Sequence, residues 1–240
     1  MSKENQHQSG DSRAEVVAVE TAAPRASLRL FILSGQSNMG KLDPDATFLP
    51  ALRQAFPEDE LVVVKSALGG QPIRRWYKAW KPVAPMSESW NERENGDLYD
   101  VLMTKVRNSL GSRRPDSICF VWMQGERDAK TGHGAVYERS LAGLLGQLRA
   151  DLGREDVYVV IGRISGHGLG AYADWELVRA AQVRVAQSDP LAAWVDTDDL
   201  DGPEHELHYT EQGYRELGRR FAQKAIALIR GLGHDLQKKG

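Results

Sequence analysis

The sequence predicts an α/β fold built on a parallel sheet. Five short, β-rich apolar runs recur along the chain, and amphipathic helical stretches lie between them. Strands that alternate with helices form βαβ units, whose right-handed crossovers make the strands parallel. A polar motif follows each apolar run, which matters because open parallel sheets bind ligands beyond the carboxyl ends of their strands.

The five expected strands are each short enough, and apolar enough, to be buried on both faces of a sheet. The third run contains Cys119, the only cysteine of the chain, which we expect to be a small buried hydrophobe. In chain order the runs are Leu28–Leu33, Leu61–Val64, Ile118–Met123, Val157–Ile164 and Ala192–Val195.

Apolar side chains at helical spacing predict the elements between these strands. The segment from Gln71 to Asn95 differs, because it combines several prolines with four large aromatic residues and has no periodic pattern. We expect an irregular excursion there, which is either functional or folded over its own aromatic residues as a small satellite core. The expected helices are Leu98–Leu110, Val136–Leu152, Asp174–Gln187 and Gln212–Arg230.

Composition is typical of one large globular domain, which we place at residues 26–235. The chain has 240 residues, of which 41% are hydrophobic and 27% charged. A formal net charge of -2 gives no indication of a nucleic-acid partner or a polybasic membrane surface, and no apolar stretch is long enough for a membrane span. Residues 1–25 are polar and lack a signal-peptide core, so we expect a disordered tail. The compartment is then cytoplasmic, or extracellular with a leader removed; the oligomeric state stays open.

Polar motifs follow all five expected strands, so their side chains should meet at one edge of the sheet. A single motif would mean little, but five at the same edge predict a shared site. The motifs are Gly35-Gln36-Ser37-Asn38, Gly69-Gly70-Gln71, Gln124-Gly125-Glu126-Arg127-Asp128, Ser165-Gly166-His167-Gly168, and the acidic stretch Asp196 to Glu206, which is followed by His208.

This set contains the groups that acyl transfer needs, namely a nucleophile, a base and donors for an oxyanion. Ser37 supplies the hydroxyl, although a serine at this place could also simply cap a helix. His208 lies ahead of an expected helix and could serve as the base. The backbone N–H groups of Ser37 and Gly70, with the side-chain amide of Gln124, could form the oxyanion hole.

Taken together and in this order, these motifs resemble the SGNH hydrolase superfamily. The match includes Trp122 to Glu126 and Leu207-His208-Tyr209-Thr210, and it is most similar to the sialate O-acetylesterase and acetylxylan esterase group, carbohydrate esterase family six. The resemblance implies a flavodoxin-like α/β/α sandwich with strand order 2-1-3-4-5 and no cofactor. It implies removal of acetyl groups from acetylated carbohydrate through an acyl-serine, with Ser37 as nucleophile and His208 as base.

The sequence departs from the family pattern at position 205, where an Asp that orients the histidine is expected and His205 stands instead. Without an orienting group the correct imidazole tautomer is less populated. Glu126 is our first choice for this group, because it matches the other acid of the family. The alternatives that flank His208 are Glu204, Glu206, Asp201 and Asp199.

We expect substrate contacts from Gln36, Asn38, Gly69, Arg74 and Trp76. Arg74 and Trp76 could line a sugar-binding rim, since aromatic faces pack on sugar rings; the alternative is a charge pair and one core tryptophan. We expect Arg127 and Asp128 to form a structural ion pair. We expect His167 to be an exposed loop residue; the alternative, since it lies near the proposed site, is a contact with substrate. The spacing of His205 and His208 does not favour a metal site.

Two other functions fit parts of the sequence. Replacement of the expected Asp by His205 is compatible with a carbohydrate-binding protein that has lost catalysis on an esterase scaffold. The expected fold alone would also permit a flavodoxin-like cofactor binder. That second alternative is weak, because no phosphate-cradling glycine loop follows the first expected strand.

Overall fold

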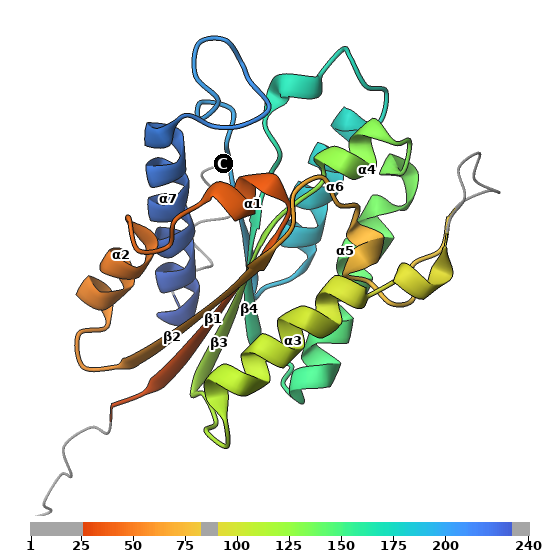
Figure 1. Ribbon diagram of the computed structural model, residues 1–240. Coiled ribbons are helices and arrows are strands. Elements are labelled where there is room, and N and C mark those ends of the chain that lie inside the picture. Colours follow the sequence, from red (N-terminus) through yellow and green to blue (C-terminus); the bar gives the residue numbers. More distant parts are fainter. Residues whose placement is uncertain (1–25, 83–90, 232–240) are drawn as a thin grey trace, which may run out of the picture.

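The computed structural model describes residues 26–82 and 91–231, which form a three-layer α/β/α sandwich (Figure 1). The five strands are parallel and lie in the order β2-β1-β3-β4-β5, which confirms the expected fold class and topology. The expected tail at residues 1–25 and the domain end at 235 lie outside the described residues, so these boundaries stay predictions. The strands are β1 (Leu28–Gly35), β2 (Glu60–Ala67), β3 (Ser117–Met123), β4 (Val157–Gly162) and β5 (Ala192–Val195).

Helices cover both faces of the sheet. Figure 1 shows α2 (Phe48–Ala55) and α7 (Glu211–Ile229) on one face, with α3 (Asp97–Leu110), α5 (Gly134–Leu152) and α6 (Trp175–Ser188) on the other. The four long helices begin and end within two residues of the expected positions. Two short helices, α1 (Ser37–Lys41) and α4 (Glu126–Lys130), directly follow β1 and β3. None of the helices in the described part of the chain has the length and apolar character that a membrane span needs.

The core lies where the central strands meet the two helical layers. Every residue of β3 is buried, as are the last six of β1, because helices cover both faces. Cys119 is fully buried in β3, as expected, and burial raises the pKa of its thiol. Burying one large apolar side chain stabilises a fold by roughly 1.5–3 kcal/mol, so these two strands dominate the stability of the sheet.

The aromatic residues of the irregular excursion belong mostly to this core. Trp76 and Trp80 are both buried, and Trp76 packs edge-on against Trp122 with ring centroids 5.3 Å apart. Trp80 packs in the same way against His133, also at 5.3 Å. Two 3₁₀ turns, Ile73–Arg75 and Glu92–Glu94, are the regular elements of the excursion within the described residues. Trp90 lies outside them. Trp76 and Trp80 therefore join the main core, and neither the functional excursion nor a separate satellite core describes them.

A glycine allows the end of β1 to lie close between its neighbouring strands, β2 and β3. Gly35 has a φ of +143°, and a Cβ at this position would lie 1.9 Å from the carbonyl oxygen of Met123. The next N–H, from Gln36, donates to that same oxygen at 3.0 Å, while Leu68 donates its N–H to the Gly35 carbonyl at 3.1 Å. Only glycine permits this close approach. The turn that delivers Ser37 is thus fixed by the ends of β2 and β3.

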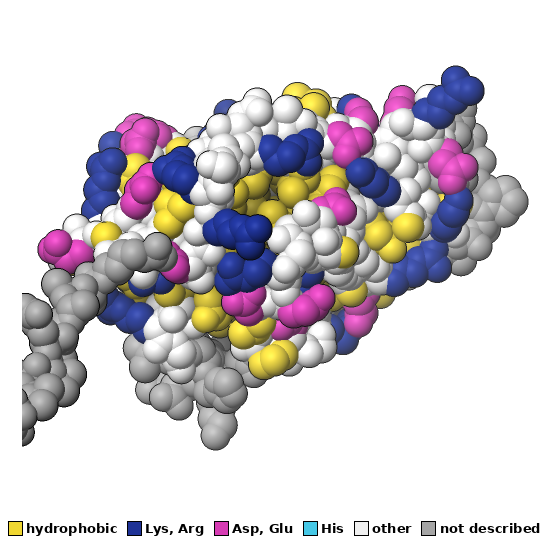
Figure 2. All heavy atoms as spheres, turned by 90° about the horizontal axis from the view of Figure 1, so that it is seen from below, with side chains coloured by type: hydrophobic (Ala, Val, Ile, Leu, Met, Phe, Trp, Pro, Cys, Tyr) yellow, Lys and Arg dark blue, Asp and Glu magenta, His cyan; other side chains and the backbone are white. Residues whose placement is uncertain are grey.

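The opposite end of the sheet, where the strands begin, carries paired surface charges. Figure 2 shows this end from below, with basic and acidic side chains interspersed around an apolar centre. The ion pair of Arg29 with Asp59 (2.6 Å) and that of Arg154 with Asp156 (2.5 Å) come from segments at the starts of strands. The five polar motifs of the sequence all lie at the opposite end, where the strands finish.

Candidate active site

Ser37 lies where the sequence predicts it, at the first residue of α1 directly after β1, and its side chain is partly buried. Gly69 lies alongside, since a Cβ built on it would be 3.5 Å from the Ser37 Cβ. Gly70 has a φ of +69°, a conformation that favours glycine. Among the described residues, neither the Ser37 N–H nor the Gly70 N–H has a hydrogen-bond acceptor. These two N–H groups therefore remain available to an oxyanion, although the role itself stays a prediction.

Asn38 connects the beginning of the chain to its end. Its Nδ2 donates to Glu126 Oε1 at 2.8 Å and to the Leu207 carbonyl at 3.2 Å, while its Oδ1 accepts from the Tyr214 hydroxyl at 2.8 Å. The side chain is only 1% exposed. Because Asn38 follows Ser37 and Leu207 precedes His208, this amide holds the two expected catalytic segments at one edge of the sheet. Its polar atoms are all used, which favours a positioning role over the expected substrate contact.

His208 lies partly buried ahead of α7. Burial lowers the pKa of its imidazole, and the positive charges of Lys41 and Lys130 lower it further. A neutral ring at pH 7 is what a general base requires. Among the described residues, no hydrogen bond joins this ring to Ser37, and no carboxylate forms a hydrogen bond or ion pair with it. Which acid orients His208 is therefore still a prediction.

Glu126, our first choice for that acid, is 2% exposed at the start of α4. Burial raises the pKa of this carboxyl group. One of its oxygens accepts from Asn38, and the other, Oε2, has no hydrogen-bond partner among the described residues. Its connection to His208 runs through Asn38 and the Leu207 carbonyl. In this geometry Glu126 positions the segment that carries His208 without touching its ring.

The alternative acids are also placed by the structure. Asp199 forms a bidentate pair with Arg220, at 2.7 and 2.6 Å. Asp201 is buried, and its Oδ1 lies 3.4 Å from Nδ1 of His205. Among the described residues, His205 is the one non-glycine residue with a left-handed backbone, at φ 48°. The remaining two acids, Glu204 and Glu206, are exposed.

Gln124 lies beneath the Gly69–Ile73 turn and is fully buried. Its amide donates to Asp128 Oδ2 at 2.6 Å, to the Gln71 carbonyl at 3.1 Å and to Gln36 Oε1 at 3.3 Å. The amide hydrogens are thus engaged by the protein. This geometry favours a role in holding the turn that carries Gly70, whereas the expected donation to an oxyanion stays untested.

Asp128 is a site residue that the sequence did not lead us to single out for function. Its Oδ2 accepts from the Ile73 N–H at 2.8 Å as well as from Gln124, and the side chain is fully buried. Burial raises its pKa to about 7. Perturbed acids of this kind cluster at functional sites. The signal available in the sequence was its place two residues after Glu126, in a motif at a strand end.

Arg127 does not pair with Asp128, contrary to the expectation of a structural ion pair. Its Nε donates to the Gly70 carbonyl at 2.7 Å, and its backbone N–H donates to Gln36 Oε1 at 3.2 Å. Gln36 is only 3% exposed, so its side chain supports the site from inside the protein and is not placed to contact a substrate. The two neighbours on α4 instead hold two points of the same turn, Arg127 from outside and Asp128 from inside.

The expected sugar-binding rim takes a different form in the structure. Trp76 is 1% exposed, so it cannot stack on a sugar ring in this conformation. Arg74 donates to Glu94 at 2.9 Å. The alternative of a charge pair and a core tryptophan fits both residues better. Within the described residues, no three His, Cys, Asp or Glu side chains gather so that they could hold a metal ion.

Comparison with known proteins identifies a family. Residues 40–227 match the family described as carbohydrate esterase, sialic acid-specific acetylesterase. The matched region contains Gly70, Gln124, Glu126 and His208 and begins three residues after Ser37. No curated protein matches the chain.

Solved structures share the fold at low sequence identity. A protein from Arabidopsis thaliana has a TM-score of 0.64 and 20% identity, over 85% of this chain and 98% of its own. A carbohydrate acetylesterase from Xanthomonas citri has a TM-score of 0.63 and 18% identity, over 85% of this chain and 56% of its own. The protein NanS has a TM-score of 0.61 and 14% identity, over 88% and 99%. These likenesses extend over most of the chain and concern the fold.

Proposed function

Because the chain belongs to the carbohydrate esterase family described as sialic acid-specific acetylesterases, we propose that it removes O-acetyl groups from carbohydrate through an acyl-serine intermediate. The observation that carries this proposal is the bridge made by Asn38. Its amide bonds Glu126 and the Leu207 carbonyl, so the residues next to it and next to Leu207, Ser37 and His208, lie at one edge of the sheet.

In the proposed reaction His208 takes the proton of Ser37 Oγ as that oxygen attacks the acetyl carbonyl. The N–H groups of Ser37 and Gly70 donate to the resulting oxyanion. His208 then protonates the sugar oxygen, which leaves as a hydroxyl, and acetyl-Ser37 remains. A water molecule, deprotonated by His208, hydrolyses this ester and releases acetate. Ser37 and His208 are not hydrogen bonded in the free protein, and catalytic hydrogen bonds commonly tighten only once substrate binds.

Charge near the site favours an anionic substrate. Lys41 and Lys130 lie close enough to His208 to lower its pKa, after the larger effect of burial, and Arg127 holds the neighbouring Gly70 carbonyl. Positive groups beside a site raise the local concentration of anions, and here they act against the single opposing charge of Glu206 on His208. Between the two sugar classes that the sequence leaves open, this supports an acetylated acidic sugar of the sialate type over neutral acetylxylan.

The test is acetate release from three substrates by the wild type and Ser37→Ala. The substrates are O-acetylated sialic acid, acetylated xylan and 4-nitrophenyl acetate. We expect turnover of the chromogenic ester, preference for the acidic sugar, and loss of both activities in Ser37→Ala by several orders of magnitude. Unchanged hydrolysis by Ser37→Ala would reject the proposed nucleophile, and preference for xylan would reject the charge argument alone.

One observation favours a second function, that of a carbohydrate-binding protein without catalysis. No carboxylate among the described residues is bonded to the His208 ring, and His205 stands where the family pattern has an acid. This alternative predicts saturable binding of sialic acid or xylo-oligosaccharide together with no acetate release from any of the three esters. Calorimetric titration of the same preparation distinguishes it from the esterase.

A further inference from the structure

A pocket of about 340 Å³ lies between the loops that follow β4 and β5. Gly166 and His167 come from the first loop, and Asp198, Asp201 and His205 come from the second. Its volume is at the lower end of the range for small-molecule pockets, which suits a single sugar unit. None of these residues is the nucleophile, the base or an oxyanion donor of the proposed acyl transfer; Asp201 is one of the alternative acids for His208.

The pocket adjoins the proposed base. His205 is three residues before His208 in the sequence, and the charge of His167 is close enough to contribute to the lowered pKa of His208. The two loops also touch across the pocket, since Nδ1 of His167 is 2.6 Å from the His205 carbonyl oxygen. A group bound here would therefore lie beside an ester that is held between Ser37 and His208.

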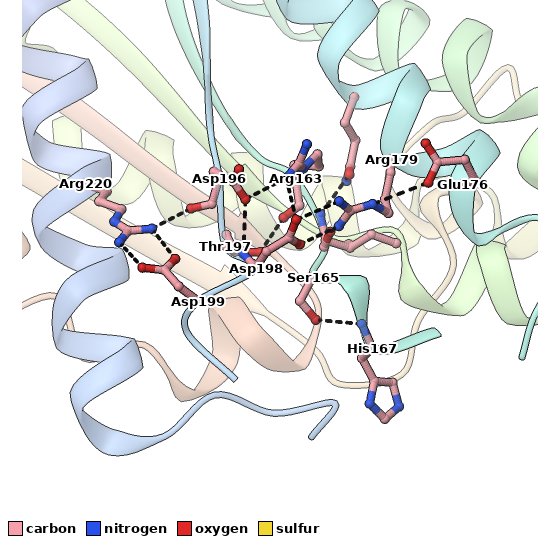
Figure 3. A network of polar contacts seen from close by, with 12 residues as sticks. Arg163, Ser165, His167, Glu176, Arg179, Asp196, Thr197, Asp198, Asp199 and Arg220 are labelled. Atoms are coloured by element: carbon pink, nitrogen blue, oxygen red, sulfur yellow. Dashed lines mark hydrogen bonds and ion pairs between the residues drawn. The ribbon is translucent and has the colours of Figure 1, made fainter. Parts of the chain in front are cut away.

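One of the five lining residues, Asp198, is held by a network of ion pairs (Figure 3). Arg179 on α6 donates to both oxygens of Asp198, at 2.7 and 2.9 Å, and to the Ile164 carbonyl at 2.5 Å. Arg163 reaches the same carboxylate at 2.7 Å. Figure 3 shows His167 projecting away from this network on the loop that begins at Ser165. Binding against a side chain that is already fixed loses little entropy in ordering it.

The chemistry of the lining suits hydroxyl groups. Asp201 is 3% exposed, and its Oδ1 has no hydrogen-bond partner among the described residues; Nδ1 of the His205 ring lies 3.4 Å from it. A buried acceptor without a donor is unfavourable, so a hydroxyl that reached it would gain a bond at little cost. The imidazoles of His167 and His205 can each donate or accept. Leu169, which is 47% exposed, lies against Gly166 and offers an apolar surface to sugar C–H groups.

We propose that this pocket is a subsite for the neutral hydroxyl groups of one sugar unit, which positions the acetyl ester beside Ser37. The inference rests on the proposed esterase function and extends it to substrate recognition. It separates two tasks at the carboxyl end of the sheet. The turns after β1 and β2 carry the acyl chemistry, and the loops after β4 and β5 select the alcohol part of the ester.

The test compares an ester with a sugar against one without. His205→Ala and His167→Ala are assayed on O-acetylated sialic acid and on 4-nitrophenyl acetate, with Glu211→Gln, an exposed carboxylate of α7, as the matched control. We expect kcat/KM on the acetylated sugar to fall about 10-fold or more, mainly through KM, as loss of one or two hydrogen bonds to substrate predicts. Hydrolysis of 4-nitrophenyl acetate should stay within about 2-fold of the wild type by the same reasoning.

Equal losses on both esters, or no loss on either, would overturn the subsite. His167→Ala keeps the test valid if His205→Ala unfolds, which thermal melting reports. If the wild type hydrolyses neither ester, the esterase proposal fails, and binding of sialic acid is measured directly by calorimetry. Binding that is lost in His167→Ala but kept in Glu211→Gln would then still support the subsite, and binding equal in all three would reject it.

Discussion

The two ends of the sheet use the same residue types in opposite ways. Where the strands begin, acidic and basic side chains are interspersed over the surface (Figure 2). They form pairs, of which Arg154 with Asp156 is partly exposed. Where the strands end, Glu126, Asp128 and Asp201 are buried, and each keeps one oxygen without a hydrogen-bond partner among the described residues. Burial raises the pKa of the first two. Charges at the first end are paired, whereas the second end, besides pairs such as Arg179 with Asp198, also keeps desolvated acids that chemistry can use.

The largest effect expected at the carboxyl end follows loss of the base. His208→Ala should reduce kcat/KM on 4-nitrophenyl acetate by roughly 10³-fold or more, as loss of a catalytic triad member does elsewhere. His205→Ala is the matched control, because it removes an imidazole of the same loop that is paired with Asp201. A greater loss in His205→Ala than in His208→Ala would reverse the assignment of the base.

Glu126→Gln comes next, with an expected loss of roughly 10- to 100-fold in kcat, the scale of a small misplacement of catalytic groups. Its amide oxygen can still accept from Asn38, so the variant tests the carboxylate charge and not the contact alone. Glu204→Gln, an exposed acid four residues before His208, should remain near wild-type activity. The reverse ranking would show that the acid that orients His208 comes from the loop after β5.

Asp128→Asn tests the difference between the two ends of the sheet through the pH dependence of stability. The pKa of Asp128 is raised by burial to about 7, from an ordinary value of 3.8. The stability linked to this proton is therefore fully present below about pH 4 and is lost as the pH rises through 7. Asn cannot ionise, so the melting temperature of the wild type relative to Asp128→Asn should fall between about pH 4 and pH 7 and change little at higher pH. Each kcal/mol corresponds to roughly 2–4 °C in a domain of this size. Groups that face Asp128 and also enter its titration are Arg74, His133 and Tyr137.

If the difference in melting temperature did not depend on pH, Asp128 would behave like the paired charges at the end where the strands begin. The activity of Asp128→Asn is a second test, because displacement of the turn that carries Gly70 should lower kcat equally on both esters. That pattern differs from the KM effect expected for the sugar subsite.

The smallest effect is expected where the strands begin. Arg154→Gln removes the pair with Asp156, whose side chains are 30% and 63% exposed. Exposed pairs contribute about 0–1 kcal/mol, so chemical denaturation should detect little change, and activity should be unaltered. A clear loss of activity in this variant would show that the end where the strands begin also contributes to function.

How far the sequence predicts this molecule depends on whether a pattern is local. Strand β3 and helix α7 were predictable because their apolar spacing reflects burial against neighbouring layers. Helix α4 was not, since a helix of five residues rich in charge carries no apolar stripe. Helix α2 was also missed, although it buries Phe48 and Leu52.

The site was predictable in its place and less so in its contacts. The motif order brought Ser37 and His208 to one edge, which the bonds of Asn38 support. The sequence did not distinguish a core tryptophan from a rim tryptophan at position 76, because that difference is set by packing against Trp122. Nor did it indicate that Arg127 and Asp128 would diverge, since side-chain partners depend on where the Gly69–Ile73 turn passes.

The close approach at Gly35 has a consequence for engineering. A methyl group there would overlap the main chain of β3, so repacking of side chains cannot relieve the collision. Libraries that randomise the nucleophile turn should return glycine alone at this codon while tolerating variety elsewhere. Altered substrate preference is better sought in the loops after β4 and β5, which can be rebuilt without moving the serine.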